Sequence, residues 1–142
     1  MNAKEIIQLL DLQPHPEGGY FRETYRDPDS CANNRAASTA IYFLLEAGEI
    51  SRWHKVDAAE IWHWYAGAPL CLAISEGQNN KLLELHLGGN LKNGERPQAI
   101  VPKNAWQQAW SLGPWTLVGC TVAPGFDFSG FEIAPDTFNP RQ

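Results

Sequence analysis

The sequence has few cysteines, no cluster of basic residues and no long apolar run. Its three cysteines, Cys31, Cys71 and Cys120, lie far apart and form no CxxC pair, which argues against a disulfide framework or a zinc knuckle. They indicate free thiols in a reducing cytoplasm. The net charge of −5 argues against nucleic acid and anionic membranes as partners. No apolar stretch is long enough to cross a bilayer, and the N-terminus lacks the apolar region of a signal peptide.

What the 142 residues do contain is a series of short β-type runs. A helix is expected over residues 4–12, where Ile6, Ile7, Leu9 and Leu10 form an apolar face and Pro14 follows. Loops are expected at residues 27–37 and 76–80. Turn signals recur without alternating helices, which predicts one all-β antiparallel domain over residues 1–142. We expect strands at residues 20–26, 38–46, 50–54, 60–65, 70–75, 81–87, 98–101, 105–111, 115–123 and 126–133.

The stretch from Ser51 to Gly67 concentrates the polar chemistry of the chain. If residues 50–54 and 60–65 pair as a hairpin, His54 and Glu60 meet at one end of the sheet. Six tryptophans are many for this length, and aromatic side chains often line ligand pockets. Ordinary core packing is the other explanation for some of them. The candidate pocket walls are Trp53, Trp62, Trp64 and Trp106.

His54 is the best candidate for acid–base chemistry, with Glu60 or Asp57 as its carboxylate partner. A neutral imidazole that a carboxylate orients can accept or donate a proton near pH 7. The alternative is that His54 only binds a ligand or stabilises the hairpin. A phenol could assist, and the sequence leaves its source open among Tyr20, Tyr42 and Tyr65.

Two spacings carry a resemblance to a known superfamily. His54, Val56, Glu60 and Gly67 fit a pattern that resembles the first cupin motif, H-x-H-x3or4-E-x6-G, with Val56 in place of the second histidine. Residues 102–107 resemble the second motif, P-x-G-x-x-H, although Asn104 and Gln107 replace its glycine and histidine. Cupin-fold sugar epimerases use a His–Asp pair and a tyrosine for proton transfer.

Five segments together resemble the cupin-5 family, once called DUF985. The resemblance implies a cupin jelly-roll barrel, or double-stranded β-helix, with a short N-terminal helix and an internal pocket. It also implies a homodimer that binds a small-molecule ligand. The family's biochemical role is poorly defined, so the resemblance informs the fold more than the function. The segments are residues 14–26, 38–45, 60–67, 101–107 and 117–128.

The departures from the motifs bear on metal binding. Typical metal cupins bind with two or three histidines and one glutamate, whereas the matching positions here are His54, Glu60 and Gln107. One imidazole, one carboxylate and one amide make a weak transition-metal site. We therefore expect no cofactor and no tightly bound metal, and leave open a weakly held divalent ion on these three residues.

Other polar residues have simpler interpretations. Arg22, together with Glu17 and Glu23, belongs to a segment that lies beside the barrel mouth in cupins. Arg22 could hold a carboxylate or phosphate, or form an exposed ion pair of little energetic value. Strand alternation places His63 opposite Glu60, as a hydrogen-bonded outer residue or a subunit contact. We expect His15 to be a solvated turn residue and His86 to face outward, while Cys71 and Cys120 are expected to be inert core thiols.

Three functions are compatible with these residues. The first is a metal-independent isomerase or epimerase acting on a sugar-like or other small polar metabolite, with His54 as base and Glu60 as its partner. The second is a non-catalytic module that binds or senses such a metabolite. The third and weakest is a metal-dependent oxygenase. An enzyme requires His54 to be within hydrogen-bond reach of a carboxylate and open to the cavity.

Overall fold

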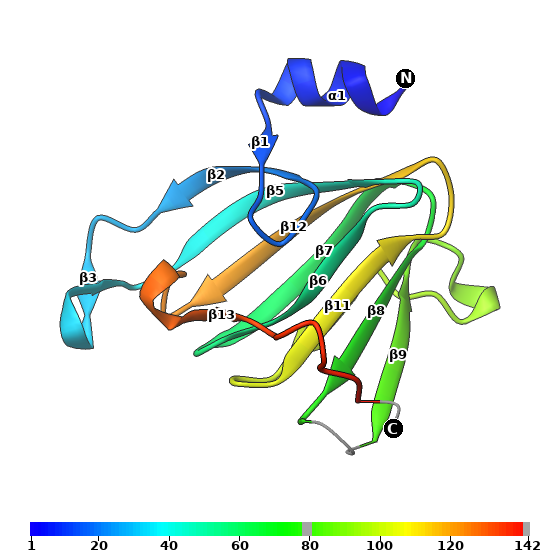
Figure 1. The fold of residues 1–142 in the computed structure, drawn as a ribbon. Coiled ribbons are helices and arrows are strands. Elements are labelled where there is room, and N and C mark those ends of the chain that lie inside the picture. Colours follow the sequence, from blue (N-terminus) through cyan, green and yellow to red (C-terminus); the bar gives the residue numbers. More distant parts are fainter. Residues whose placement is uncertain (78–80, 141–142) are drawn as a thin grey trace.

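The computed structural model, which describes residues 1–77 and 81–140, shows two antiparallel sheets packed face to face as a jelly-roll β-sandwich (Figure 1). This confirms the predicted all-β class with one short helix. The six-stranded sheet has the order β1 (Gln13–Pro14), β2 (Tyr20–Arg26), β5 (Thr39–Glu46), β12 (Trp115–Ala123), β7 (Ala59–Gly67) and β10 (Gln98–Val101). The five-stranded sheet has the order β13 (Phe131–Ile133), β6 (Ile50–Val56), β11 (Trp106–Ser111), β8 (Leu70–Ser75) and β9 (Leu82–Leu87).

Helix α1 (Ala3–Leu10) covers the outer face of the six-stranded sheet (Figure 1). Its N-terminus carries a capping box, in which Asn2 Oδ1 accepts the Glu5 N–H and Glu5 Oε1 accepts the Asn2 N–H. Ile6 is buried in the same cluster as Leu44 of β5. The helix ends two residues before the predicted boundary, because Asp11 adopts a left-handed conformation with φ 54°.

The main core lies between the two sheets, because side chains alternate along each strand. On β5, Phe43 and Leu45 face the interior while Leu44 faces the helix. On β7, Trp62 belongs to the interior cluster and is 1% exposed. The inner faces of both sheets supply the rest of this cluster, including Leu70, Leu72, Leu87, Val101, Ala109, Val118 and Cys120.

Four local predictions need correction or restriction. Residues 50–54 and 60–65 do not form a hairpin: β6 pairs with β11 and β13, whereas β7 pairs with β12 and β10. The expected loop at 27–37 contains a small hairpin, β3 (Ser30–Cys31) and β4 (Arg35–Ala36), around a 3-10 turn. The expected strand at 126–133 is reduced to β13 (Phe131–Ile133), after the third 3-10 turn at Phe128–Gly130, a further one being at Leu91–Asn93. In the turn predicted at 76–80, residues 78–80 lie outside the described residues.

Candidate functional site

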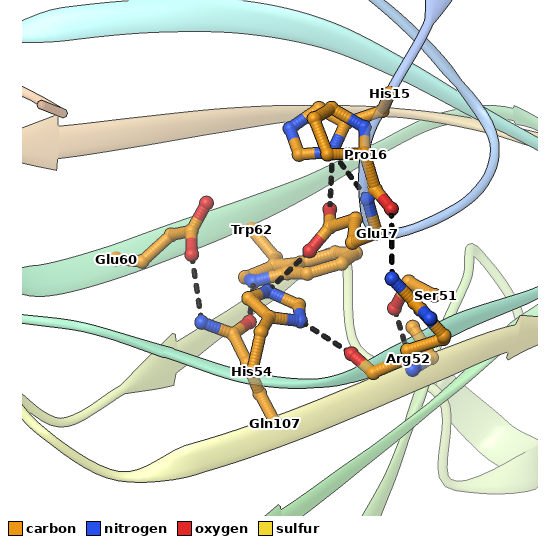
Figure 2. A network of polar contacts seen from close by, with 10 residues as sticks. His15, Pro16, Glu17, Ser51, Arg52, His54, Glu60, Trp62 and Gln107 are labelled. Carbon is orange, nitrogen blue, oxygen red and sulfur yellow. Dashed lines mark hydrogen bonds and ion pairs between the residues drawn. The ribbon is translucent and has the colours of Figure 1, made fainter. Parts of the chain in front are cut away.

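A buried polar cluster lies between the sheets and has two arms (Figure 2). One, the strand arm, consists of Glu60 and Trp62 on β7 and Gln107 on β11. The other, the loop arm, consists of His15 and Glu17 in the loop before β2 and of His54 on β6. The arms are adjacent, because Gln107 is the register partner of His54 across β11 and β6. His54 and Glu60 thus reach one interior region from opposite sheets instead of from one hairpin.

The strand arm is a chain of two hydrogen bonds that ends at Glu60, whose carboxylate also interacts with Cys120 at the cavity. The Trp62 indole N–H donates to Gln107 Oε1 at 2.9 Å, and Gln107 Nε2 donates to Glu60 Oε1 at 2.8 Å. The contact between Gln107 and Glu60 supports the alignment of the second cupin motif. Burial raises the pKa of Glu60, although the charge of His54 and the Gln107 hydrogen bond oppose that rise.

The loop arm contains a buried ion pair. His54 Nε2 lies 2.6 Å from Glu17 Oε2, and the two side chains are 3% and 6% exposed. Its other nitrogen, Nδ1, lies 2.7 Å from the Arg52 carbonyl oxygen. Burial pulls the pKa of His54 down, but Glu17, Glu60 and the Arg52 carbonyl outweigh it, so that the pKa is raised. The immediate carboxylate partner of His54 is therefore Glu17, whereas Glu60 acts on it at longer range.

His15 is not the solvated turn residue that the sequence suggested, because its side chain is only 6% exposed. Its ring packs edge-on against Phe21 and Phe43, with centroid separations of 4.5 and 5.7 Å. The Glu17 N–H donates to His15 Nδ1 at 3.1 Å, and Glu17 Oε1 lies 3.7 Å from the same atom. Burial lowers the pKa of His15 and the charge of His54 adds to this, although Glu17 acts in the opposite direction.

A cavity of about 370 Å³ opens beside this cluster, between the inner faces of β2, β5 and β12 and the segment after β12. Its buried part contains His15, Thr39 and Cys120, so the loop arm reaches the cavity through His15. His54 and Glu60 are not among the described residues that line it. The apolar walls are Phe21, Ile41, Val122, Phe126 and Phe128, and the polar rim is formed by Asp11, Gln13, Arg22, Glu23 and Arg26.

The four tryptophans predicted as pocket walls are not among the described residues that line the cavity, and Arg22 lies only at its rim. Trp62 and Trp64 share the inner face with Glu60, as predicted, but pack into the core. Trp53 and Trp106 lie on the outer face of the five-stranded sheet and pack against Phe138 of the C-terminal segment. The reason is alternation, because His54 and Gln107 point inward and their neighbours must point outward. Arg22 lies at the rim, where its guanidinium donates to the Leu10 carbonyl at 3.3 Å.

The remaining sequence candidates lie outside the cavity. His63 is hydrogen-bonded to Thr121 on the outer face, and His86 is exposed, as expected for both. Asp57 forms an ion pair with Arg35 at 2.7 Å, which makes it an unsuitable partner for His54. The three tyrosines considered as phenol donors do not line the cavity within the part of the chain described.

Cys71 is 1% exposed and Cys120 is 3% exposed, as expected for core thiols. Cys120 nevertheless borders the cavity, and burial together with Glu60 and Glu17 raises its pKa well above the usual range. This thiol therefore stays protonated near neutral pH and is a poor nucleophile.

The three residues at the cupin metal positions are already bonded to other groups of the protein. His54 Nε2 is engaged by Glu17 and its Nδ1 by a carbonyl, while Gln107 Oε1 already accepts from Trp62. Within residues 1–77 and 81–140, no three His, Cys, Asp or Glu side chains are grouped so that they could hold a metal. In this arrangement His54, Glu60 and Gln107 do not fit a metal ion.

Sequence reasoning gave His15 no role and grouped Glu17 only with the residues expected near the mouth. A signal was present, because two titratable residues stand in a turn made of two prolines and two glycines. Gly18 and Gly19 have positive φ, and a Cβ on them would approach the carbonyl oxygens of Ile50 and Leu44 to 2.6 and 2.8 Å. Such close packing indicates a loop that is built into the interior.

Comparison with known proteins agrees with this architecture. Residues 4–134 match the family described as Cupin superfamily (DUF985). The chain is 30% identical to the uncharacterised protein YML079W of Saccharomyces cerevisiae, over 89% of this chain and 72% of the yeast protein. The crystal structure of protein SO0799 from Shewanella oneidensis is 38% identical, with a TM-score of 0.89, and the match covers 94% of this chain and 85% of that one.

A more distant structure, oxalate decarboxylase from Bacillus subtilis, is 15% identical with a TM-score of 0.64, over 87% of this chain and 30% of that chain. At this identity the likeness concerns the fold alone. No helix in the described residues has the length and apolarity needed to span a membrane. From the family match and the shared fold, we conclude that the chain belongs to the DUF985 family of the cupin superfamily.

Proposed function

We propose that this protein binds a small molecule with a mainly apolar body in the cavity between β2, β5 and β12. The observation that carries the proposal is the cavity itself, whose volume of about 370 Å³ lies in the range of small-molecule sites. Its aromatic and aliphatic walls surround a few polar groups, which is the usual composition of such sites. These walls favour a less polar ligand than the sugar-like metabolite that the sequence suggested.

The test is to fill the cavity and measure binding. Ile41 lies on the inner face of β5 and lines the cavity, whereas Ile61 is half-buried on the outer face of β7. A library of small aromatic and alicyclic compounds is screened by ligand-observed NMR against the wild type, Ile41→Phe and Ile61→Phe. We expect Ile41→Phe to remove the hits and Ile61→Phe to keep them. Equal binding to all three proteins would contradict a ligand site in the cavity.

A second candidate is metal-independent proton transfer, of the kind that an isomerase or epimerase performs. It is favoured by the continuous contact from His54 through Glu17 to His15, which links a buried ion pair to the cavity. In this scheme His15, not His54, is the histidine that meets the ligand. Catalysis would appear as solvent deuterium incorporation into a bound compound, lost in Glu17→Gln while binding remains. Binding without such exchange would leave only the non-catalytic function.

We also propose a homodimer and a cytoplasmic location. Apolar side chains are exposed on the outer surface of the six-stranded sheet, where Tyr65 is 51% and Ile100 is 62% exposed. Cys31 and Cys120 are free thiols in the described structure, which suits a reducing compartment. Sedimentation equilibrium of the wild type and of Ile100→Glu tests the dimer, since a charge in the interface should shift it to monomer.

A further inference from the structure

The loop from His15 to Gly19 holds the His15 ring in one orientation. Pro14 and Pro16 flank His15 and restrict the backbone on both sides. The His15 N–H donates to the Gly19 carbonyl at 2.9 Å, and the Gly18 N–H donates to the His15 carbonyl at 3.0 Å. The loop is also bonded to β6, because the Arg52 N–H donates to the Glu17 carbonyl at 2.7 Å. The imidazole is therefore presented to the cavity by a preorganised loop.

The hydrogen bond at Nδ1 determines the tautomer of His15. A backbone N–H can only donate, so the Glu17 N–H requires a lone pair on His15 Nδ1. In the neutral ring the proton must then be on Nε2. Figure 2 shows the ring nitrogen that is not bonded to Glu17 pointing away from that residue. Among the described residues, His15 Nε2 has no hydrogen-bond partner, and the ring lines the cavity.

The other buried groups around this donor limit the charge of a ligand. Thr39 Oγ1 already accepts the Phe126 N–H at 2.8 Å, which leaves its hydroxyl proton as a donor. The buried carboxylates Glu17 and Glu60 act electrostatically on Cys120, which borders the same cavity. Arg22 and Arg26 line only the rim, so an anionic group in the buried part beside His15 would still be repelled by these carboxylates, although His54 pairs with Glu17. A neutral oxygen acceptor satisfies the donors without this repulsion.

We infer that His15 is the recognition residue of the cavity and that its Nε2–H donates to a neutral oxygen, such as a carbonyl, on the apolar body of the ligand. This inference rests on the proposed function and names the class of ligand. Glu17 is a positioning residue in this scheme, because its N–H fixes the His15 tautomer. The aromatic walls formed by Phe21, Phe126 and Phe128 surround the rest of the ligand.

The first experiment reads the tautomer directly and needs no ligand. Side-chain ¹⁵N chemical shifts of histidine-labelled protein are measured near pH 7.5, with His15 assigned by the loss of its signals in His15→Asn. We expect His15 to show a protonated Nε2 and an unprotonated Nδ1. A proton on Nδ1 would overturn the inference, whatever the cavity binds.

The second experiment uses three probes of similar shape: acetophenone with a carbonyl, α-methylstyrene with a methylene group in its place, and benzoate with a negative charge. We expect the wild type to bind acetophenone about 3- to 10-fold more tightly than α-methylstyrene, as one net hydrogen bond gives. Benzoate should bind more weakly than acetophenone. Dissociation constants come from NMR titration of the Ile41 methyl signals.

Two variants distinguish the hydrogen bond that His15 Nε2–H donates from the packing of the His15 ring. His15→Asn keeps an oxygen that can accept the Glu17 N–H but does not reach the Nε2 position, whereas His15→Phe keeps the ring. Both should bind acetophenone and α-methylstyrene equally. A preference that persists in both variants, or equal binding in the wild type, would overturn the role of His15 and leave cavity binding intact. Failure of all three probes to bind the wild type would count against the proposed function as well.

Discussion

The two arms of the buried cluster differ in how their residues are held and in what they leave free. In the strand arm, Glu60 and Trp62 on β7 bond to Gln107 on β11, a strand of the opposite sheet. In the loop arm, His15 and Glu17 come from a loop, and His15 reaches the cavity. The strand arm therefore acts as a structural clamp between the sheets, whereas the loop arm offers a group for chemistry.

The strongest test of this difference is the removal of Glu17. Glu17→Ala leaves the buried His54 imidazolium without its counter-charge, and breaking such a pair costs about 3–5 kcal/mol. Glu17→Gln keeps the volume and an acceptor oxygen, so its loss should be smaller. Both values come from urea unfolding at pH 6. A cost below about 1 kcal/mol for Glu17→Ala would show that the ion pair does not stabilise the fold.

The clamp of the strand arm can be broken at Gln107. Gln107→Leu leaves the Trp62 N–H and Glu60 without their partner in a dry interior, which should cost about 2–3 kcal/mol. The matched control is Gln108→Leu, because Gln108 is the next residue on β11 and is half-buried on the outer face. Its effect should stay within about 0.5 kcal/mol in the same unfolding assay. Equal losses in both variants would argue against the clamp.

The raised pKa of His54 predicts a pH dependence of stability. Stabilisation from a raised pKa is fully present below the unfolded value, about 6.5, and is lost as pH rises through the folded-state pKa. The free energy of unfolding should therefore fall above pH 6.5, by about 1.4 kcal/mol for each tenfold increase in proton affinity on folding. His54→Gln should flatten this decline, while His86→Gln on the exposed face of β9 should not. An unchanged slope in His54→Gln would assign the decline to another group.

The smallest expected effect concerns the rim. Arg22→Ala removes only an exposed contact with the Leu10 carbonyl, so stability should change by less than about 0.5 kcal/mol and acetophenone binding should not change. Arg26 is different, because it bonds Glu23 and also the Phe126 carbonyl, which belongs to the cavity wall. Arg26→Ala should weaken acetophenone binding in the NMR titration. Weaker binding in Arg22→Ala would restore the ligand role that the sequence suggested for Arg22.

The predictable part of the site lies on strands with clear alternation. The spacing of the motifs placed Gln107 beside Glu60, and the period of two placed Trp62 inward and His63 outward. Strand pairing was less predictable, because β6 finds its partner β11 about fifty residues later and not in β7 next to it. The loop arm was missed because its geometry depends on contacts such as that between Glu17 and Arg52, which no local pattern encodes.

The bond between the Glu17 carbonyl and the Arg52 amide has a dynamic consequence. It fastens the loop to β6 of one sheet, while β2, which follows the loop, belongs to the other. A breathing motion that separates the sheets along this edge must stretch that bond and withdraw His15 from the cavity. Opening the cavity and withdrawing its donor are therefore one motion, and the protection of the Arg52 amide from hydrogen exchange should report the free energy of that opening.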